Sequence, residues 1–488
     1  MLNRKALYGL LSLIIILATL LAACAPAATA APAAPAAPAA PAAPAAPAAP
    51  AAPAATTAPA APVPTAAPVA PAAQPVNLTM WFDPGGDATQ AKCVMENVVG
   101  VWNQKNPTIH MDASLQANAW DATRTAVTGG GGPDIVYTPG PSFAFQMAKA
   151  GQLLALDDYS KSMNWDKQFL PWALSLGQVD GKLYSIPNEI ETIILYYNKT
   201  VFDAHGWKPP TTIDEYMALN ETIKKAGLIP NAIGNKSWKP TDEHHVTLFL
   251  NHMAGPQMVY DALKGKVKFN DPAFVKALDT MDGLLMNGYF MGGLDRYYTT
   301  TEDEFETALG NGKAAMMPTG TWKLGTMNKY FGKDANNTND WDWVPFPTAD
   351  GKTLFTLGIG STYSINAATK NPKEAAQFLT YYFSPEAQSA TITKCGIAPA
   401  PINITADKLN GIDPRRARLI AELNKAAGEG NYGYTTWTFF PPKSDEYIYS
   451  NIEKVWAKQM TLTDYIAGLQ KIFDQELAAG NIPPIPTR

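Results

Sequence analysis

A repeat of alanine and proline without any charge fills the chain from Ala25 to Pro75, and between Pro32 and Pro53 a proline recurs at every third position. Such a segment has no large apolar side chains to bury, and without glycine at the same period it cannot form a collagen helix. We expect a semi-rigid, polyproline-like stalk that reaches up to ~150 Å at ~3.1 Å per residue. The folded part of the chain is therefore expected to begin near Val76.

The first 23 residues have the pattern of an export signal. Basic Arg4 and Lys5 precede an apolar run from about Leu7 to Leu20, which falls short of the ~20 residues of a membrane span, so we expect cleavage. Leu21 to Cys24 resembles the bacterial lipoprotein box, in which the cysteine becomes the lipidated first residue. This resemblance implies an acylated Cys24 that holds the protein on the outer face of the cell membrane, with residues 24–75 as the linker.

The remaining region, from about Val76 to Arg488, has about 410 residues, which suits two lobes better than one core. The formal net charge of −5 argues against nucleic acid, which is attracted by basic patches. Beyond Cys24 only Cys93 and Cys395 remain. In an exported protein they suggest a disulfide, although two separate buried thiols would read the same, and neither spacing nor neighbours indicate a metal site. We expect no cofactor and no metal.

The folded region alternates strands and helices in the manner of an α/β protein. Val76–Phe82 and Ile109–Leu115 are expected strands with a helix, 88–104, between them, and Asp134–Tyr137 is an expected short buried strand. Thr212, with Glu215 three residues later, predicts a capping box for a helix that ends at Lys225. Further helices are expected at 119–127, 241–253, 272–286, 301–309, 321–330, 372–383, 385–393, 414–427, 445–460 and 462–479, and strands at 313–317, 342–347 and 358–366.

The stretch Tyr184–Lys199 is expected to lie at the centre of the fold. Pro187 allows a strand start or an edge strand but no central ladder position, so the chain should enter extended there and continue as one strand from Ile190 to Tyr197. Glu189 and Glu191 are two residues apart, and strand alternation places both carboxylates on one face. We expect that face to look into a cleft.

Five short motifs in a fixed order resemble the extracellular solute-binding proteins of ABC sugar importers, the maltose-binding-protein-like family. The motifs are Gly132-Pro-Asp-Ile-Val-Tyr137, Gly181-Lys-Leu-Tyr-Ser-Ile-Pro187, Tyr197-Asn-Lys199, Gly312-Lys-Ala-Ala-Met-Met317 and Asn371-Pro-Lys-Glu-Ala-Ala376. The resemblance covers essentially all of residues 76–488. It implies two discontinuous α/β lobes that close on a sugar, an ABC permease as partner, and no enzymatic activity. We expect a monomer.

The resemblance also implies where the chain passes between the lobes. The crossings fall near 190–192, 345–354 and 405–414, so that 76–191 and 351–410 form the first lobe and 192–350 and 411–488 the second. Cys93 and Cys395 then belong to the same lobe, which favours the disulfide. Such a bond would stiffen that lobe without blocking closure.

Sugar recognition needs flat aromatic surfaces for the ring faces and a few polar groups for the hydroxyls. By the resemblance, Glu191 sits where the family places a sugar-binding carboxylate and Trp322 where it places a stacking tryptophan. Trp120 could belong to the core or to the cleft. The full set of expected ligand-binding residues is Trp81, Asp83, Tyr137, Glu189, Glu191, Trp238, Trp322 and Trp437.

Two alternative functions remain open from the sequence. Glu189 and Glu191 could serve a secreted glycoside hydrolase, but adjacent positions on one strand face point the same way, whereas a hydrolase needs its carboxyls on both sides of the scissile bond. A glycerol phosphate ligand is the second alternative, against which stands the absence of an obvious arginine cluster. Asp242-Glu243-His244-His245, with His252, resembles a metal cluster, but we interpret it as an ordinary helix start after Thr241.

Overall fold

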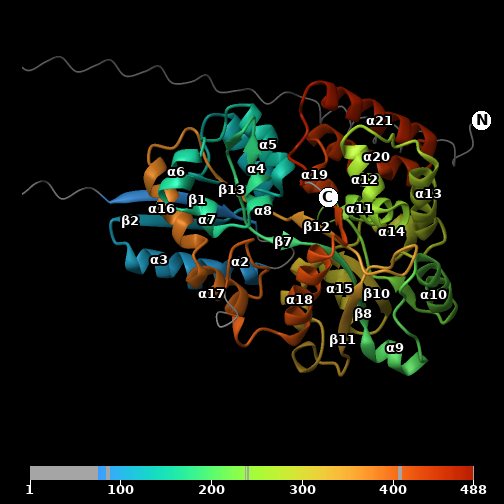
Figure 1. Cartoon of the computed structure of the whole chain (residues 1–488). Coiled ribbons are helices and arrows are strands. Elements are labelled where there is room, and N and C mark those ends of the chain that lie inside the picture. Colours follow the sequence, from blue (N-terminus) through green and yellow to red (C-terminus); the bar gives the residue numbers. More distant parts are fainter. Residues whose placement is uncertain (1–74, 84–87, 237, 239–240, 405–408, 487–488) are drawn as a thin grey trace, which may run out of the picture. The chain divides into compact units, whose positions relative to one another are not determined.

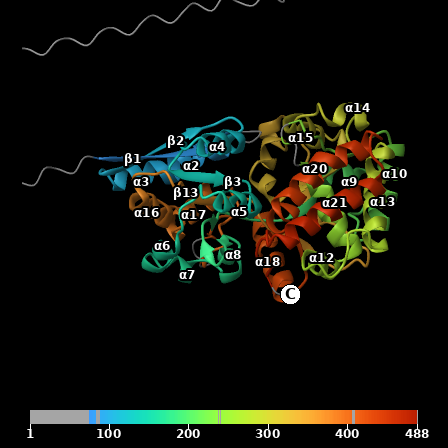
Figure 2. The ribbon, with the colours of Figure 1, turned by 90° about the horizontal axis from the view of Figure 1, so that it is seen from above.

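The computed structural model describes residues 75–83, 88–236, 238, 241–404 and 409–486. The predicted export signal, Cys24 and the linker to Pro75 lie outside the described residues, and so does part of the expected crossing at 405–414. Within the described residues, no helix is both long enough and apolar enough to cross a membrane. Two groups of strands and helices, one at each end of Pro71–Arg488, are seen in two perpendicular views (Figures 1 and 2). We call them the first and second lobes.

The first lobe is built on a five-stranded mixed sheet in the order β2-β1-β3-β13-β6. Its strands are β1 (Val76–Phe82), β2 (Ile109–Leu115), β3 (Ile135–Thr138), β6 (Ile186–Pro187) and β13 (Thr362–Ile365). β1 pairs in parallel with β2 and β3, and β13 runs antiparallel to β3 and β6. As Pro187 predicts, β6 lies at the edge of this sheet.

Helices cover both faces of this sheet. Alternation along β1 sends Leu78 and Met80 into one core, which also holds Trp102 and Phe378, whose rings meet edge to face at 5.6 Å. The helices of the first lobe are α2 (Thr89–Val94), α3 (Gly100–Lys105), α4 (Ala119–Thr128), α5 (Pro141–Lys149), α16 (Pro372–Tyr382) and α17 (Pro385–Cys395). The predicted helix at 88–104 is confirmed, with a π-helical turn at Met95–Val99 between α2 and α3.

The second lobe is built on a four-stranded sheet in the order β11-β8-β10-β9. Its strands are β8 (Ile193–Asn198), β9 (Ile229–Asn231), β10 (Ala314–Gly320) and β11 (Trp341–Pro345). The principal helices are α9 (Lys199–His205), α10 (Ile213–Lys225), α11 (Thr241–Phe249), α12 (Pro256–Leu263), α13 (Pro272–Met286), α15 (Glu302–Gly310), α18 (Pro414–Gly428), α19 (Thr436–Phe439), α20 (Pro442–Trp456) and α21 (Leu462–Ala478). The predicted capping box of Thr212 and Glu215 is present at the start of α10.

A small third sheet lies between the two larger ones, in the order β14-β12-β7 (Figure 1). Its strands are β7 (Ile190–Glu191), β12 (Phe355–Ile359) and β14 (Tyr432–Tyr434). The single strand expected at 190–197 is therefore wrong, because β7 pairs with β12 whereas β8 belongs to the sheet of the second lobe. The strand expected at 358–366 is divided for the same reason, between β12 and β13.

The helix expected at 321–330 is also wrong. The structure has two short 3-10 turns there, Thr321–Gly325 and Met327–Lys329. Gly325 is packed so closely that a Cβ atom added to it would lie 2.1 Å from the carbonyl oxygen of Gly396. The close approach of two backbones, together with the low helix propensity of glycine, replaces a regular helix here.

The outer strand β11 hydrogen-bonds with side chains along its backbone. The N–H groups of Trp341 and Trp343 donate to the carboxylates of Asp340 and Asp342, at 2.9 and 2.8 Å. Arg418 from α18 stacks on Trp343, with its guanidinium 4.4 Å from the ring centroid, and donates to the Trp343 carbonyl at 2.8 Å. Helix α18 is thus fastened to this strand.

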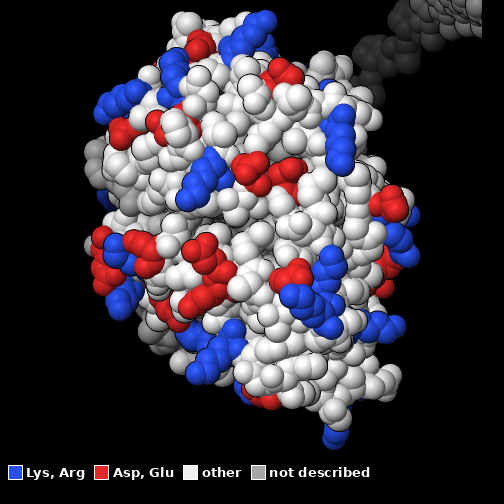
Figure 3. Space-filling model, turned by 90° about the vertical axis from the view of Figure 1, so that its right-hand side faces the viewer, with Lys and Arg blue, Asp and Glu red and all other residues white. Residues whose placement is uncertain are grey.

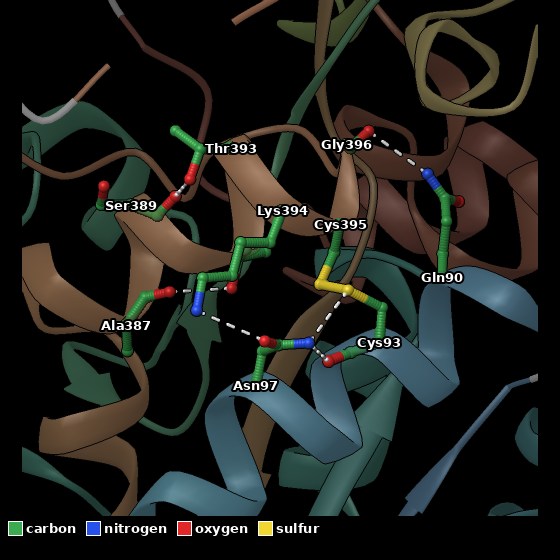
Figure 4. Close-up of a disulfide and its surroundings, with 10 residues drawn as sticks. Gln90, Cys93, Asn97, Ala387, Ser389, Thr393, Lys394, Cys395 and Gly396 are labelled. Carbon is green, nitrogen blue, oxygen red and sulfur yellow. Dashed lines mark hydrogen bonds between the residues drawn. A yellow bond between two sulfur atoms is a disulfide. The ribbon is translucent and has the colours of Figure 1, made fainter. Parts of the chain in front are cut away.

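Cys93 and Cys395 form a disulfide that joins α2 to the last residue of α17 (Figure 4). Their Cα atoms lie 5.6 Å apart, although 302 positions separate them in the sequence. Around the bond, Asn97 donates to the Cys93 carbonyl at 3.0 Å, and Gln90 donates to the carbonyl of Gly396 at 3.2 Å. The expectation of a disulfide is confirmed over that of two free thiols.

Candidate functional site

A cavity of about 770 Å³ is lined by residues of both lobes and of the segments that join them. Asp83 follows β1, Tyr137 lies in β3, and Glu189 and Glu191 lie at the passage from β6 to β7. The second lobe adds Thr319 at the end of β10, together with residues of the 3-10 turn after β10, α11, α15, α19 and α20. The size is in the range of small-molecule sites.

Seven of the eight residues expected at the cleft line this cavity. They are Asp83, Tyr137, Glu189, Glu191, Trp238, Trp322 and Trp437. Trp81 is the exception, because strand alternation turns it away from the side of Met80 and Phe82, and it is half-buried without belonging to the lining. Trp120, which the sequence leaves between core and cleft, is buried and also borders the cavity.

The carboxyl groups of Glu189 and Glu191 share a hydrogen bond, as their placement on one face predicts. Ser361 donates a further hydrogen bond to Glu189 at 3.1 Å. Burial raises the pKa of both carboxyls, and the charge of Glu189 raises the pKa of Glu191 further, well above its ordinary value. The pair therefore holds a proton more firmly than exposed glutamates do.

Gly360 is what makes room for this pair. A Cβ atom at Gly360 would lie 1.8 Å from the carboxyl carbon of Glu191. No side chain larger than hydrogen fits there with Glu191 in its present position. The sequence alone gives no sign of this requirement.

Three rings form an aromatic group on the second-lobe side. The imidazole of His244 lies 5.3 Å from the Trp322 ring and 5.4 Å from the Trp437 ring, between centroids. Trp322 also lies directly over Gly320, where a Cβ atom would come within 1.8 Å of the ring. Burial lowers the pKa of His244 to about 3, so this imidazole is neutral at physiological pH.

Sequence reasoning missed His244 because Asp242 to His245 was interpreted as an ordinary helix start. Helix α11 does begin there, but all four side chains are buried. Asp242 accepts from Tyr297 and Asn235, and Glu243 accepts from Thr436 at 2.8 Å. Among the described residues no group of histidine, cysteine and acidic side chains is arranged to hold a metal ion. Only the packing of α20 against α11 reveals this burial.

Both basic residues of the lining are engaged with acidic residues that also belong to it. Lys323 contacts Glu302 at 2.8 Å and Glu306 at 2.6 Å, and it is largely buried with Glu306. Arg124 contacts Asp121 at 3.1 Å, an exposed pair of little energetic weight. Further lining residues that the sequence did not single out include Phe305, Tyr330, Tyr363, Tyr382 and Tyr449.

Two lobes around a cavity of carboxyls and flat aromatic rings define a protein that binds a small polar molecule. A model of the bacterial extracellular solute-binding protein family matches residues 88–389, more than half of the chain. The chain belongs to this family.

Several relatives cover most of the chain at low identity. A "Multiple sugar-binding protein" from Streptococcus mutans is 26% identical over 67% of this chain and 76% of its own length. A "Diacetylchitobiose binding protein" from Streptomyces coelicolor is 22% identical over 78% of this chain and 79% of its own length.

Solved structures share the fold. A "Chitin oligosaccharide binding protein" superposes with a TM-score of 0.70 at 20% identity, covering 83% of this chain and 99% of that one. A protein solved in a study of xylan utilization by Caldanaerobius polysaccharolyticus gives a TM-score of 0.66 at 26% identity, covering 81% of this chain and all of that one. The two-lobe fold of solute-binding proteins is thus confirmed.

Proposed function

We propose that this protein is the solute-binding component of an ABC importer, that it captures a carbohydrate, most simply an oligosaccharide, in the cavity, and that it delivers this ligand to the permease. The observation that carries the proposal is the lining itself. Trp322, Trp437 and Tyr137 offer flat apolar surfaces, and Glu189 and Glu191 offer acceptors for hydroxyl groups. Relatives named as sugar-binding proteins support the same class of ligand.

In this proposal, the ligand binds first to one lobe, and closure adds the contacts of the other. The lobes comprise 76–191 with 351–410, and 192–350 with 411–488. The backbone at β7 and β12 would absorb the rotation, since the chain passes between the large sheets there. The ligand stabilises the closed form by its differential affinity for the two forms. The permease would recognise that closed form, and a separate ATPase would supply the energy.

We also propose a membrane tether through an acylated Cys24 after removal of residues 1–23. The support is the sequence around Leu21 to Cys24 and the family of the folded region. In cells, Cys24→Ala should move the protein from the membrane fraction to the soluble fraction. Retention of Cys24→Ala in the membrane would contradict the tether without affecting the proposed ligand.

A thermal-shift and calorimetric screen of the full-length protein against mono-, di- and oligosaccharides tests the ligand class. A sugar at about 100 times its dissociation constant adds ~2.7 kcal/mol to stability. Trp322→Ala should weaken that sugar at least about tenfold. Trp456→Ala is the matched control, since Trp456 is fully buried outside the cavity and should lower stability by about 3–5 kcal/mol instead.

The alternatives make different predictions in the same screen. The shared hydrogen bond of Glu189 and Glu191 places the two carboxyls beside each other, whereas a retaining hydrolase holds them ~5–5.5 Å apart around the scissile bond. Sugar cleavage that disappears in Glu191→Gln would nevertheless overturn the proposal. Glycerol phosphate needs cationic partners, and Lys323 is already engaged by two carboxylates. A stronger shift with glycerol phosphate than with any sugar would overturn the carbohydrate assignment.

A further inference from the structure

We infer that the ligand of this cavity carries a protonated amine, so that the carbohydrate of the proposed function, on which this inference rests, is an amino sugar whose nitrogen is not acetylated. The argument concerns what the cavity offers to a ligand beyond flat surfaces. It starts from the pair formed by Glu189 and Glu191.

Glu191 is a buried carboxyl at the cavity with an acidic partner. Its side chain is 7% exposed and lines the cavity, and its side-chain hydrogen bond is to the carboxyl of Glu189. The nearest guanidinium to influence the pair, that of Arg416, acts on Glu189 through its charge but donates its hydrogen bond to the Gly396 carbonyl. A buried carboxyl pair without a bonded cation is costly to ionise.

The rest of the lining strengthens the negative potential. Carboxyl residues outnumber lysine and arginine by eight to two in the lining. Lys323 and Arg124, the two cations, are each bound to acidic residues of the same lining. A ligand therefore meets a cavity with an excess of carboxyls that no lining cation balances.

An ammonium group fits both kinds of surface in this cavity. It would form ion pairs with Glu189 and Glu191 and replace the proton that the two carboxyls share, and that proton would pass to solvent. The ring faces of Trp322 and Tyr137 attract a cation as well as a sugar ring. A neutral sugar offers only hydroxyls and leaves the shared proton in place.

Proton release identifies this mode of binding, because other titratable groups around the pair keep their state. Burial raises the pKa of Tyr137, Tyr363 and Tyr382, so these phenols stay neutral. Arg416 stays charged, since arginine is effectively always protonated.

A matched series of three disaccharides tests the inference on the full-length protein. The series is the β-1,4-linked disaccharide of glucosamine with free amines, its diacetylated form, and cellobiose. We expect calorimetry to show at least tenfold tighter binding of the free amine than of either neutral sugar, with proton release in buffers of different ionisation enthalpy. Raising the salt concentration should weaken only the amine, which tests the inference without any mutation.

Variants locate the preference. Glu189→Gln and Glu191→Gln, which preserve shape, should reduce the amine's advantage over cellobiose at least tenfold. Asp158→Asn removes an exposed carboxylate outside the lining and should keep that advantage. Urea unfolding of each variant verifies folding.

Each outcome decides between the inference and the proposed function. Equal or tighter binding of cellobiose or the diacetylated sugar would overturn the inference and leave the proposed function standing. The same holds if only another neutral carbohydrate binds. Binding of no carbohydrate at all would overturn the proposed function and, with it, the inference.

Discussion

The guanidinium of Arg416 donates a hydrogen bond to the carbonyl of Gly396, the residue directly after the disulfide cysteine Cys395. The same carbonyl accepts from Gln90 in the first lobe and faces Gly325 in the turn that carries Trp322. Arg416 is almost fully buried at the start of α18. Parts of both lobes therefore meet at one carbonyl oxygen next to the disulfide.

Arg416→Ala is expected to lower the free energy of unfolding by about 1.5–3 kcal/mol, the net value of a hydrogen bond from a charged group. Urea unfolding measures this loss. Gln90→Ala removes a neutral donor to the same carbonyl and should cost only about 0.5–1.5 kcal/mol. Equal effects of the two substitutions would show that the charge of Arg416 contributes nothing at this junction.

Removal of the disulfide should lower stability by about 2–5 kcal/mol, because the bond closes a long loop in the unfolded chain. Cys93→Ala, Cys395→Ala and the double variant should unfold at the same reduced urea concentration, and reductant should shift only the wild type toward them. A wild type that is indifferent to reductant and equal to the double variant would contradict a formed disulfide. Because the bond lies within the first lobe, sugar affinity should change less than stability.

Gly360→Ala is expected to weaken ligand binding at least about tenfold, since the new methyl group would displace the carboxyl of Glu191. Titration calorimetry with the bound sugar measures the effect. Gly131→Ala is the control, because a Cβ atom there would meet the Ala126 carbonyl at an ordinary 3.8 Å, outside the cavity. Wild-type affinity in Gly360→Ala would show that Glu191 does not contribute to binding.

Asp445 should make the protein less stable as pH rises toward neutrality. Burial raises the pKa of Asp445 to about 7 in the folded protein, against about 3.9 in the unfolded chain. Its stabilising contribution is fully present below about pH 4 and is lost as the pH rises through about 7. Asp445→Asn should flatten the fall of unfolding free energy measured between those values. An unchanged slope would mean that Asp445 ionises alike in both states.

Local patterns predicted the parts of the fold that local chemistry determines. The capping box at Thr212 needs only neighbouring residues, and so does the shared face of Glu189 and Glu191. By contrast, strands β7 and β8 separate at Thr192 because their pairing partners lie far along the chain. The continuous apolar run from Ile190 contains no sign of that division.

The site was less predictable than the fold for the same reason. His244 becomes a cavity residue only because Trp322 and Trp437, from distant segments, pack against it. Trp81 was placed in the cleft on the strength of its position near a strand end, but alternation along β1 turns it away. Burial of the polar start of α11 requires α20, which lies about 200 residues later in the chain.

Charge on the surface is mixed in sign. On the face in Figure 3, lysine and arginine side chains are interspersed with aspartate and glutamate. This face therefore offers no extended basic patch of the kind that draws nucleic acid.

The carboxylates along β11 also bear on how copies of the protein behave when they are concentrated at one membrane. An outer strand with open N–H and C=O groups is a template on which a second chain can add a strand and start aggregation. Asp340, Asp342 and Arg418 already occupy such groups at Trp341 and Trp343. The sheet of the second lobe is thereby protected against edge-to-edge growth by its own side chains.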